Sequence, residues 1–336
     1  FLFNELPDKY HHNDIAASTD PYHMPEASHQ KKLPLTFHYE GWPRSTHHFM
    51  QRTGTGGMIV IEKGEIVYED YFLGTRKSSR FASWSVAKSF VSALVGVAID
   101  QGYITSVDDL VSSYVPQLLH TAYRDVTIKN ALQMSSGIQF EESNADLNSD
   151  AFRMLLAMLD SNDEFIYTLQ DKRATPGTYN YYASSDTQVL GMVLSRATGQ
   201  SVADFMQANL WRPMGAESPA TWITDTKGVE SFYCCLNATL RDYAKFGTLY
   251  LNEGQWRGHQ LLPAQWVQDS VSASEPQLVP GDNPQSNDTW GYGYQWWLPD
   301  TRSDYMAVGV FNQFIYVNPD KDIVIVKLSA NPEYTI

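Results

Sequence analysis

A serine and a lysine three residues apart stand at the start of a pronounced apolar run. Ser85 and Lys88 belong to the segment Ser83-Trp84-Ser85-Val86-Ala87-Lys88-Ser89-Phe90, and apolar residues continue to Ile99. Residues three apart lie on one face of a helix, so the hydroxyl and the amine can meet. The run therefore predicts an apolar helix that ends near Gly102 and carries a Ser–Lys pair in its first turn.

This pair suggests acyl-transfer chemistry. A serine hydroxyl is a poor nucleophile at neutral pH and needs a group that takes its proton. A lysine buried at a helix start can do so, because desolvation and the positive helix end both lower its pKa. The same spacing occurs at Ser28 and Lys31, in a polar segment that runs into Pro34 where no helix is expected. Spacing alone is therefore not decisive.

Composition limits the class of protein. The 336 residues are 43% hydrophobic and only 18% charged, which fits one large globular domain or two intertwined ones. A net charge of −14 argues against a nucleic-acid partner, since phosphate binding needs clustered Lys and Arg. No apolar stretch approaches the roughly 18 residues of a membrane span, so no membrane partner is expected.

The chain opens with Phe1, which fits a removed signal peptide, a trimmed chain or a disordered start. A periplasmic or secreted location is favoured over a cytoplasmic one.

Two cysteines stand side by side at Cys234 and Cys235. Adjacent cysteines exclude a long-range disulfide within the chain. We expect two small buried residues here, with a vicinal disulfide or a redox site as the alternative.

The chain divides into three parts. Residues 1–50 hold seven of the nine histidines without periodicity, which predicts an arm lying across the body. No Cys or paired carboxylate completes a metal-ligand spacing there, so we expect solvated histidines and no metal site. Residues 51–84 and 223–336 contain the strand patterns and predict one sheet domain, beginning with a hairpin around Lys63-Gly64. Residues 85–222 predict a mainly helical inserted domain, with the active site at the interface. The expected helices span residues 106–110, 128–134, 151–159, 187–197, 202–210 and, in the sheet domain, 239–251. The strands expected near the end span residues 290–297, 305–310, 314–317 and 323–328.

A tyrosine-rich loop supplies a second candidate site element. Residues 176–184 read Pro-Gly-Thr-Tyr-Asn-Tyr-Tyr-Ala-Ser and precede an expected helix. A tyrosine close to a lysine can relay a proton, while the alternative is that these rings only pack the loop against helices.

Five segments in order resemble the serine β-lactamase and penicillin-binding-protein superfamily, in its class C-like branch. That branch includes family VIII esterases, D-aminopeptidases and 6-aminohexanoate-dimer hydrolase. The matching segments are residues 81–89, the Leu-Gln-Met-Ser-Ser-Gly-Ile loop at 132–138, residues 176–191, residues 239–247 and residues 292–297. The resemblance implies an α+β fold, in which helices flank an antiparallel sheet and a helical domain is inserted.

The same resemblance implies roles for particular residues. Ser85 matches the nucleophile and Lys88 its base, and the spacing from Pro176-Gly177 to Gly191 places Tyr182 on the catalytic tyrosine. The backbone N–H groups of Ser85 and Val310 would form the oxyanion hole.

The chain also departs from the family pattern. Ser184 replaces the usual asparagine, and only Gly309 survives from the third motif, where Ala307 offers no cation for a carboxylate. Both changes argue against efficient β-lactam hydrolysis. Asn144 occupies the position of a substrate-binding tyrosine in 6-aminohexanoate-dimer hydrolase, and Asn312 either reaches substrate or caps a strand end.

The family's C-terminal helix has no counterpart before the chain stops at Ile336. Either that helix is missing from this sequence or the arm covers the sheet.

The sequence thus predicts a serine hydrolase that acts through an acyl-enzyme on carboxylic esters or small linear amides, without a cofactor or metal. The alternatives are a β-lactamase or D-amino-acid peptidase, and a non-catalytic penicillin-binding-like protein. The expected partner is a small-molecule substrate, and a homodimer is possible.

Overall fold

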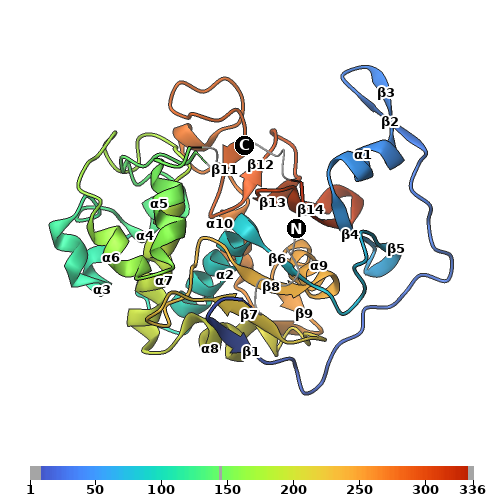
Figure 1. Cartoon of the computed structure of the whole chain (residues 1–336), viewed down its shortest axis with the longest axis horizontal. Coiled ribbons are helices and arrows are strands. Elements are labelled where there is room, and N and C mark those ends of the chain that lie inside the picture. Colours follow the sequence, from blue (N-terminus) through green and yellow to red (C-terminus); the bar gives the residue numbers. More distant parts are fainter. Residues whose placement is uncertain (1–8, 144–145, 332–336) are drawn as a thin grey trace.

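A seven-stranded antiparallel sheet forms the larger layer of the protein (Figure 1). The computed structural model describes residues 9–143 and 146–331. In spatial order the strands are β11 (Gly291–Tyr292), β12 (Trp297–Leu298), β13 (Tyr305–Gly309), β14 (Gln313–Asn318), β15 (Ile323–Ser329), β4 (Thr55–Glu62) and β5 (Glu65–Tyr71). β4 and β5 are joined through Lys63 and Gly64, both with positive φ, so the expected hairpin is confirmed.

A second, four-stranded antiparallel sheet connects the arm to the body. Its order is β1 (His12–Ile15), β7 (Ala220–Ile223), β8 (Leu236–Thr239) and β6 (Arg80–Ala82). The N-terminal segment therefore contains regular structure that its lack of periodicity did not predict. β1 is ordered by its register with β7, where Asp14 lies opposite Thr221. Backbone hydrogen bonds to the edge of the sheet therefore form this strand, although the side-chain pattern of the segment does not indicate one.

The rest of the arm ends in a projecting unit. A hairpin of β2 (Thr36–Tyr39) and β3 (Trp42–Ser45) leads into α1 (Thr46–Arg52) and stands out from the body in Figure 1. Met50 of α1 is buried, and the Phe49 ring lies 5.4 Å from the Lys327 ammonium on β15. The arm thus contacts the larger sheet at β15 through α1.

The remaining helices pack around the two sheets (Figure 1). They are α2 (Ala87–Asp100), α3 (Val111–Tyr114), α4 (Ile128–Leu132), α5 (Asp150–Ala157), α6 (Asn162–Tyr167), α7 (Ser184–Thr198), α8 (Val202–Met206), α9 (Leu240–Leu251) and α10 (Ala264–Ser270). Short 3₁₀ turns span Trp84–Val86, Pro116–His120, Pro276–Leu278 and Pro319–Lys321, a π-helical turn follows α8 at Gln207–Trp211, and β9 (Gln255–Trp256) pairs with β10 (His259–Gln260). Of the helices, α3 to α7 gather at the left of Figure 1, and α9 lies beside β8 and β9.

The helix expected at residues 106–110 is wrong. This segment is a turn, and α3 begins only at Val111. The Asp109 carboxylate accepts hydrogen bonds from the Ser106 N–H and the Tyr114 hydroxyl. An Asp side chain that bonds nearby backbone in this way competes with helix formation.

α9 carries polar residues on a helix that is almost wholly buried against the sheet. Lys245 lies 3.0 Å from Asp242 and 3.0 Å from Glu217, and Arg241 lies 2.6 Å from Glu69. Burial of these charges is tolerated because each has an ionic partner. The polar positions of this helix therefore fix its orientation from within.

The described residues hold neither a helix long and apolar enough to cross a bilayer nor a group of three His, Cys, Asp or Glu placed to bind a metal ion.

Gly247 allows α9 to approach the sheet closely. A Cβ at this position would lie 2.7 Å from Val324 Cγ1 and 2.8 Å from Ile315 Cγ2. Because both neighbours are stiff β-branched side chains on adjacent strands, we expect Gly247→Ala to destabilise the fold by about 1–3 kcal/mol in urea unfolding. Gln268→Ala on the exposed side of α10 is the control and should stay within about 0.5 kcal/mol of wild type. Equal stability of the two variants would contradict this packing.

Candidate active site

The segment before Ser85 is fixed to the edge of the smaller sheet. The Ser83 N–H donates to the Leu236 carbonyl at 2.7 Å, and the Leu236 N–H donates to Ser83 Oγ at 3.1 Å. Trp84 then turns the chain with a φ of 46°, and Ser85 lies in the 3₁₀ turn that leads into α2. The first turn of the predicted helix is therefore tighter than expected, yet it places Ser85 at the helix start.

Lys88 lies buried directly behind Ser85. Its Nζ donates to Ser85 Oγ at 2.9 Å and to the Tyr233 carbonyl at 2.8 Å, and only 1% of the residue is exposed. Burial lowers the pKa of Lys88 to about 8, against an opposing effect of the Glu142 carboxylate. The predicted meeting of hydroxyl and amine is confirmed as geometry, and a substantial fraction of the amine is neutral near pH 8.

Tyr182 is the tyrosine of its loop that lies beside Lys88. The Lys88 ammonium is 5.1 Å from the centre of the Tyr182 ring, which stacks on Trp297 at 5.3 Å. Tyr181 instead packs its ring under the Arg173 guanidinium, 3.4 Å away. The structure thus brings the tyrosine selected by motif spacing to the Ser–Lys pair.

Backbone hydrogen bonds clamp the tyrosine loop to the loop that follows α4. The Tyr181 N–H donates to the Met134 carbonyl at 2.8 Å, and the Gly177 N–H donates to the Ser135 carbonyl at 2.7 Å. The Asn180 side chain adds a bond to the Gln133 carbonyl at 2.9 Å. These hydrogen bonds therefore join the tyrosine loop and the loop after α4, which are distant in sequence, into one side of the site.

The end of β13 closes the opposite side. A Cβ on Gly309 would lie 2.7 Å from the Ser83 carbonyl oxygen and 3.1 Å from the Ser85 nitrogen, so only glycine allows this approach. Val310 follows directly, which brings its backbone next to that of Ser85. Ala307 is 99% buried at the place of the family's cation and offers no charge to a substrate carboxylate.

The proposed supporting residues have different surroundings. Ser184 begins α7, and its N–H and Oγ donate to the two Glu142 carboxylate oxygens at 2.7 and 2.6 Å. Asn312 Oδ1 accepts from the Asn331 side chain at 2.8 Å, which favours the strand-end alternative over contact with substrate. Asn144 lies outside the described residues.

Glu142 is a site residue that the sequence did not single out. Its carboxylate accepts a hydrogen bond from the Ser184 N–H at the N-terminus of α7, which is the positive end of the helix dipole. Its negative charge raises the pKa of Lys88, against the effect of burial. Burial raises the pKa of Glu142, opposed by Lys88 and Ser184. In the sequence, the only indication that Glu142 belongs to the site is its place two positions before the candidate residue Asn144.

A fully buried acid lies in the first turn of α7. Asp186 accepts a hydrogen bond from the Tyr123 hydroxyl at 2.8 Å, and burial raises the pKa of Asp186 to about 7. Nothing in the motifs pointed to this carboxyl, because helical periodicity does not reveal a polar residue that tertiary contacts bury.

The expectation of two separate buried cysteines is wrong. Cys234 and Cys235 are both buried, and they form a vicinal disulfide. The segment continues from Tyr233, whose carbonyl accepts from Lys88, and Trp222 Nε1 donates to the Cys234 carbonyl at 2.9 Å. Adjacency of the two cysteines was the signal for the disulfide alternative.

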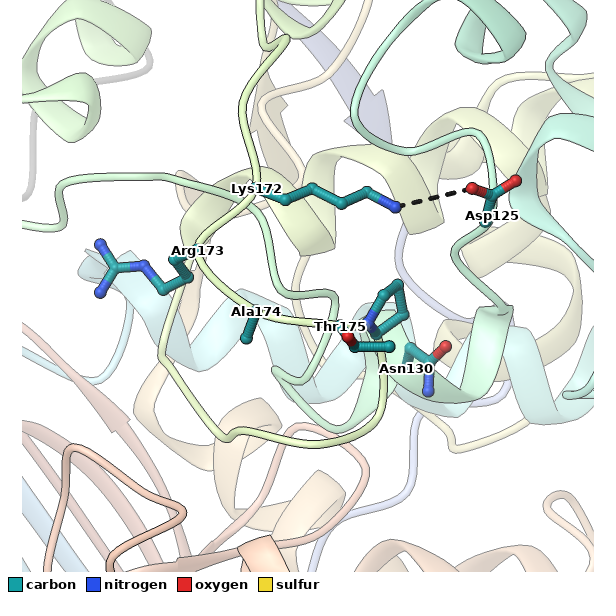
Figure 2. Close-up of a pocket in the computed structure, with 7 residues that line it drawn as sticks. Asp125, Asn130, Lys172, Arg173, Ala174 and Thr175 are labelled. Atoms are coloured by element: carbon teal, nitrogen blue, oxygen red, sulfur yellow. Dashed lines mark ion pairs between the residues drawn. The ribbon is translucent and has the colours of Figure 1, made fainter.

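A shallow hollow of about 680 Å³ lies apart from the Ser–Lys pair. Figure 2 shows Lys172 reaching across it to Asp125, 3.8 Å away, while Arg173 points elsewhere. Its remaining lining residues are Asn130, Ala174, Thr175 and Pro176. Because none of the predicted catalytic residues lines this hollow, it is no part of the candidate site.

Comparison with known proteins agrees with this geometry. Residues 44–334 match the Beta-lactamase family. The chain belongs to the beta-lactamase family. The predicted resemblance to the serine β-lactamase and penicillin-binding-protein superfamily, and the predicted α+β fold, are confirmed.

Individual relatives of this beta-lactamase-family chain are hydrolases. A 6-aminohexanoate-dimer hydrolase from Paenarthrobacter ureafaciens is 28% identical over 296 residues, covering 84% of this chain and 74% of that protein. Among solved structures, a candidate 6-aminohexanoate-dimer hydrolase from Bacillus anthracis superposes with a TM-score of 0.89 at 24% identity, over 99% of this chain and 88% of the other. EstCE1, a hydrolase with promiscuous acyltransferase activity, gives a TM-score of 0.68 at 15% identity, over 85% and 91% of the two chains. This chain is thus a hydrolase of the beta-lactamase fold.

Glu142 should hold the pKa of Lys88 up. Glu142→Gln removes the negative charge that opposes the effect of burial, so we expect the pKa of Lys88 to fall further. The measurement is an NMR titration of the lysine side chains, with Lys88→Met used to assign the Lys88 signal. Glu141→Gln, which neutralises an exposed neighbouring carboxylate, is the matched control and should leave that pKa nearly unchanged. A rise in the pKa, or equal shifts in both variants, would disprove this coupling.

Proposed function

We propose that this protein is a serine hydrolase that forms an acyl-enzyme on Ser85 and acts on carboxylic esters or small linear amides. The observation that carries the proposal is the 2.9 Å contact between Ser85 Oγ and a buried Lys88 whose pKa is lowered to about 8. A nucleophile in hydrogen-bond contact with a base of suitable pKa is the arrangement that acyl transfer requires.

In the proposed first step, the neutral Lys88 amine takes the hydroxyl proton while Ser85 Oγ bonds to the substrate carbonyl carbon. The carbonyl oxygen becomes an oxyanion, which the Ser85 and Val310 N–H groups stabilise. Collapse of this intermediate breaks the bond to the alcohol or amine, and the proton from Lys88 passes to that leaving group through Tyr182.

In the second step, water attacks the acyl-enzyme and its proton goes to Lys88. The bond between the acyl carbon and Ser85 Oγ then breaks while Lys88 returns the proton to Ser85 Oγ, which releases the carboxylic acid and restores the serine hydroxyl and the neutral amine. No metal or cofactor enters this sequence. Tyr182 acts as a relay because its ring lies beside Lys88 and is fixed by Trp297.

The surroundings favour neutral or apolar acyl groups. Trp84 and Phe311 pack edge to face at 4.8 Å next to the nucleophile, and Tyr182 with Trp297 forms the facing aromatic wall. Ala307 leaves no cation for the carboxylate of a β-lactam, and Ser184 is engaged with Glu142. The name of the Paenarthrobacter relative supports linear amides of amino acids as one substrate class to screen.

Removal of either member of the pair should abolish ester hydrolysis. We expect Ser85→Ala and Lys88→Ala each to lower kcat for p-nitrophenyl butyrate by at least about 10³-fold, because nucleophile and base act as a unit. A chromogenic cephalosporin assayed in parallel should show little turnover by wild type. Near-normal ester turnover by Lys88→Ala would contradict the assigned base, and efficient cephalosporin cleavage would favour the β-lactamase alternative.

The rate should depend on the protonation of Lys88. Only the neutral amine can accept the serine proton, so kcat/KM for p-nitrophenyl butyrate should rise with pH and level off above an apparent pKa near 8. The Ser85→Ala variant, assayed at each pH, supplies the background hydrolysis to subtract. A rate that is flat across this range, or that falls as the pH rises through it, would exclude Lys88 as the base.

A further inference from the structure

The turn that carries Val310 has an unfavourable backbone conformation. It joins β13 to β14 through Val310, Phe311 and Asn312, and the φ angles of Phe311 and Asn312 are 65° and 69°. Non-glycine residues in this left-handed region persist where surrounding contacts hold them. The position of the Val310 N–H therefore depends on what fixes this turn.

The buried side chain of Gln313 is bonded to the inside of the turn. Its Nε2 donates to the carbonyls of Val310 and Phe311, each at 3.2 Å. Only 1% of the residue is exposed, so these carbonyls are sheltered from water that could replace the amide. One side chain thus binds two of the three turn residues.

The same amide is anchored to the neighbouring strand. Gln313 Nε2 donates to the Ser329 carbonyl at 2.6 Å, and Gln313 Oε1 accepts from the Ser329 N–H at 2.9 Å. Ser329 Oγ in turn accepts from the buried Lys327 ammonium at 2.6 Å. Because β15 pairs on its other side with β4, the turn is tied to the middle of the sheet.

We propose that Gln313 is a positioning residue for the oxyanion hole, holding the Val310 N–H against the Ser85 backbone. This inference rests on the proposed function, because Gln313 would hold in place one of the two N–H donors of the proposed oxyanion hole. Gln313 contacts the turn from behind and does not touch the reacting atoms. A Cβ built on Gly309 would lie 3.1 Å from the Ser85 nitrogen, so the end of β13 that leads into Val310 lies directly against the Ser85 backbone.

The test is a comparison of two Gln313 variants with intact Ser85 and Lys88. Gln313→Met removes every side-chain hydrogen bond, and Gln313→Glu keeps the shape and the acceptor for Ser329 while removing the amide donors to the carbonyls. For both we expect kcat for p-nitrophenyl butyrate, per titrated active site, to fall about tenfold to a hundredfold with KM nearly unchanged. Titration with a covalent phosphonate removes the contribution of misfolded protein.

A second readout reports on the oxyanion hole directly. An alkyl boronic acid forms a tetrahedral adduct on serine that resembles the intermediate, so its inhibition constant should rise by a similar factor. Gln260→Met is the matched control, because Gln260 Nε2 also bonds two carbonyls, those of Glu253 and Leu262, in the remote β9–β10 hairpin. This control should retain wild-type kcat.

The possible failures are distinguishable. Wild-type kcat and boronate affinity in both Gln313 variants would overturn the positioning role and leave the proposed function intact. A raised KM at constant kcat would also overturn it, since that pattern means loss of substrate binding. Turnover that survives Ser85→Ala would instead refute the proposed function, and the positioning role with it.

Discussion

The burial of Lys88 is the constraint on which the site depends. An ammonium group with 1% exposure must be satisfied by nearby oxygen atoms, and here Ser85 Oγ and the Tyr233 carbonyl supply them. The nearby Glu142 carboxylate offsets only part of the cost of desolvation, so the pKa of the amine falls to about 8. The same burial therefore orients the serine, anchors the segment before the disulfide and prepares Lys88 for the role of base in the proposed mechanism.

Elements far apart in sequence meet around this amine. The smaller sheet holds the turn that carries Ser85 through Leu236, the hydrogen-bonded loops hold Tyr182, and the end of β13 supplies Gly309 and Val310. Each contact depends on a different tertiary interface. The proposed mechanism depends on these interfaces, because reactive groups must be held close to their reacting geometry.

Much of the fold was predictable from local pattern. Alternating apolar residues gave β4, β5 and β13 to β15, and the apolar run gave α2, because burial of one face imposes these periodicities. β1 and the turn at residues 106–110 were not predicted. β1 forms by pairing with β7, and the turn forms around hydrogen bonds to Asp109, and neither kind of contact leaves a periodic pattern in the sequence. In the site, motif order placed Ser85, Lys88 and Tyr182 together, whereas Glu142 and Gln313 lie outside the matching segments. Asp186 lies within the segment 176–191, but no motif position singles it out. The disulfide at Cys234 and the hydrogen bond between Asn331 and Asn312 depend on three-dimensional contacts.

The sequence by itself determined the chemistry that this chain offers: a serine and a lysine three residues apart at the start of an apolar helix, a tyrosine at a set spacing from Pro176-Gly177, and a glycine at a strand end. It also determined the absence of a cation at Ala307, since residue type alone decides charge. Only the tertiary structure decided how these groups are tuned. Desolvation of Lys88, the effect of Glu142 on its pKa and the clamping of the Val310 turn by Gln313 are properties of distance and burial, which chain packing sets and residue order does not state.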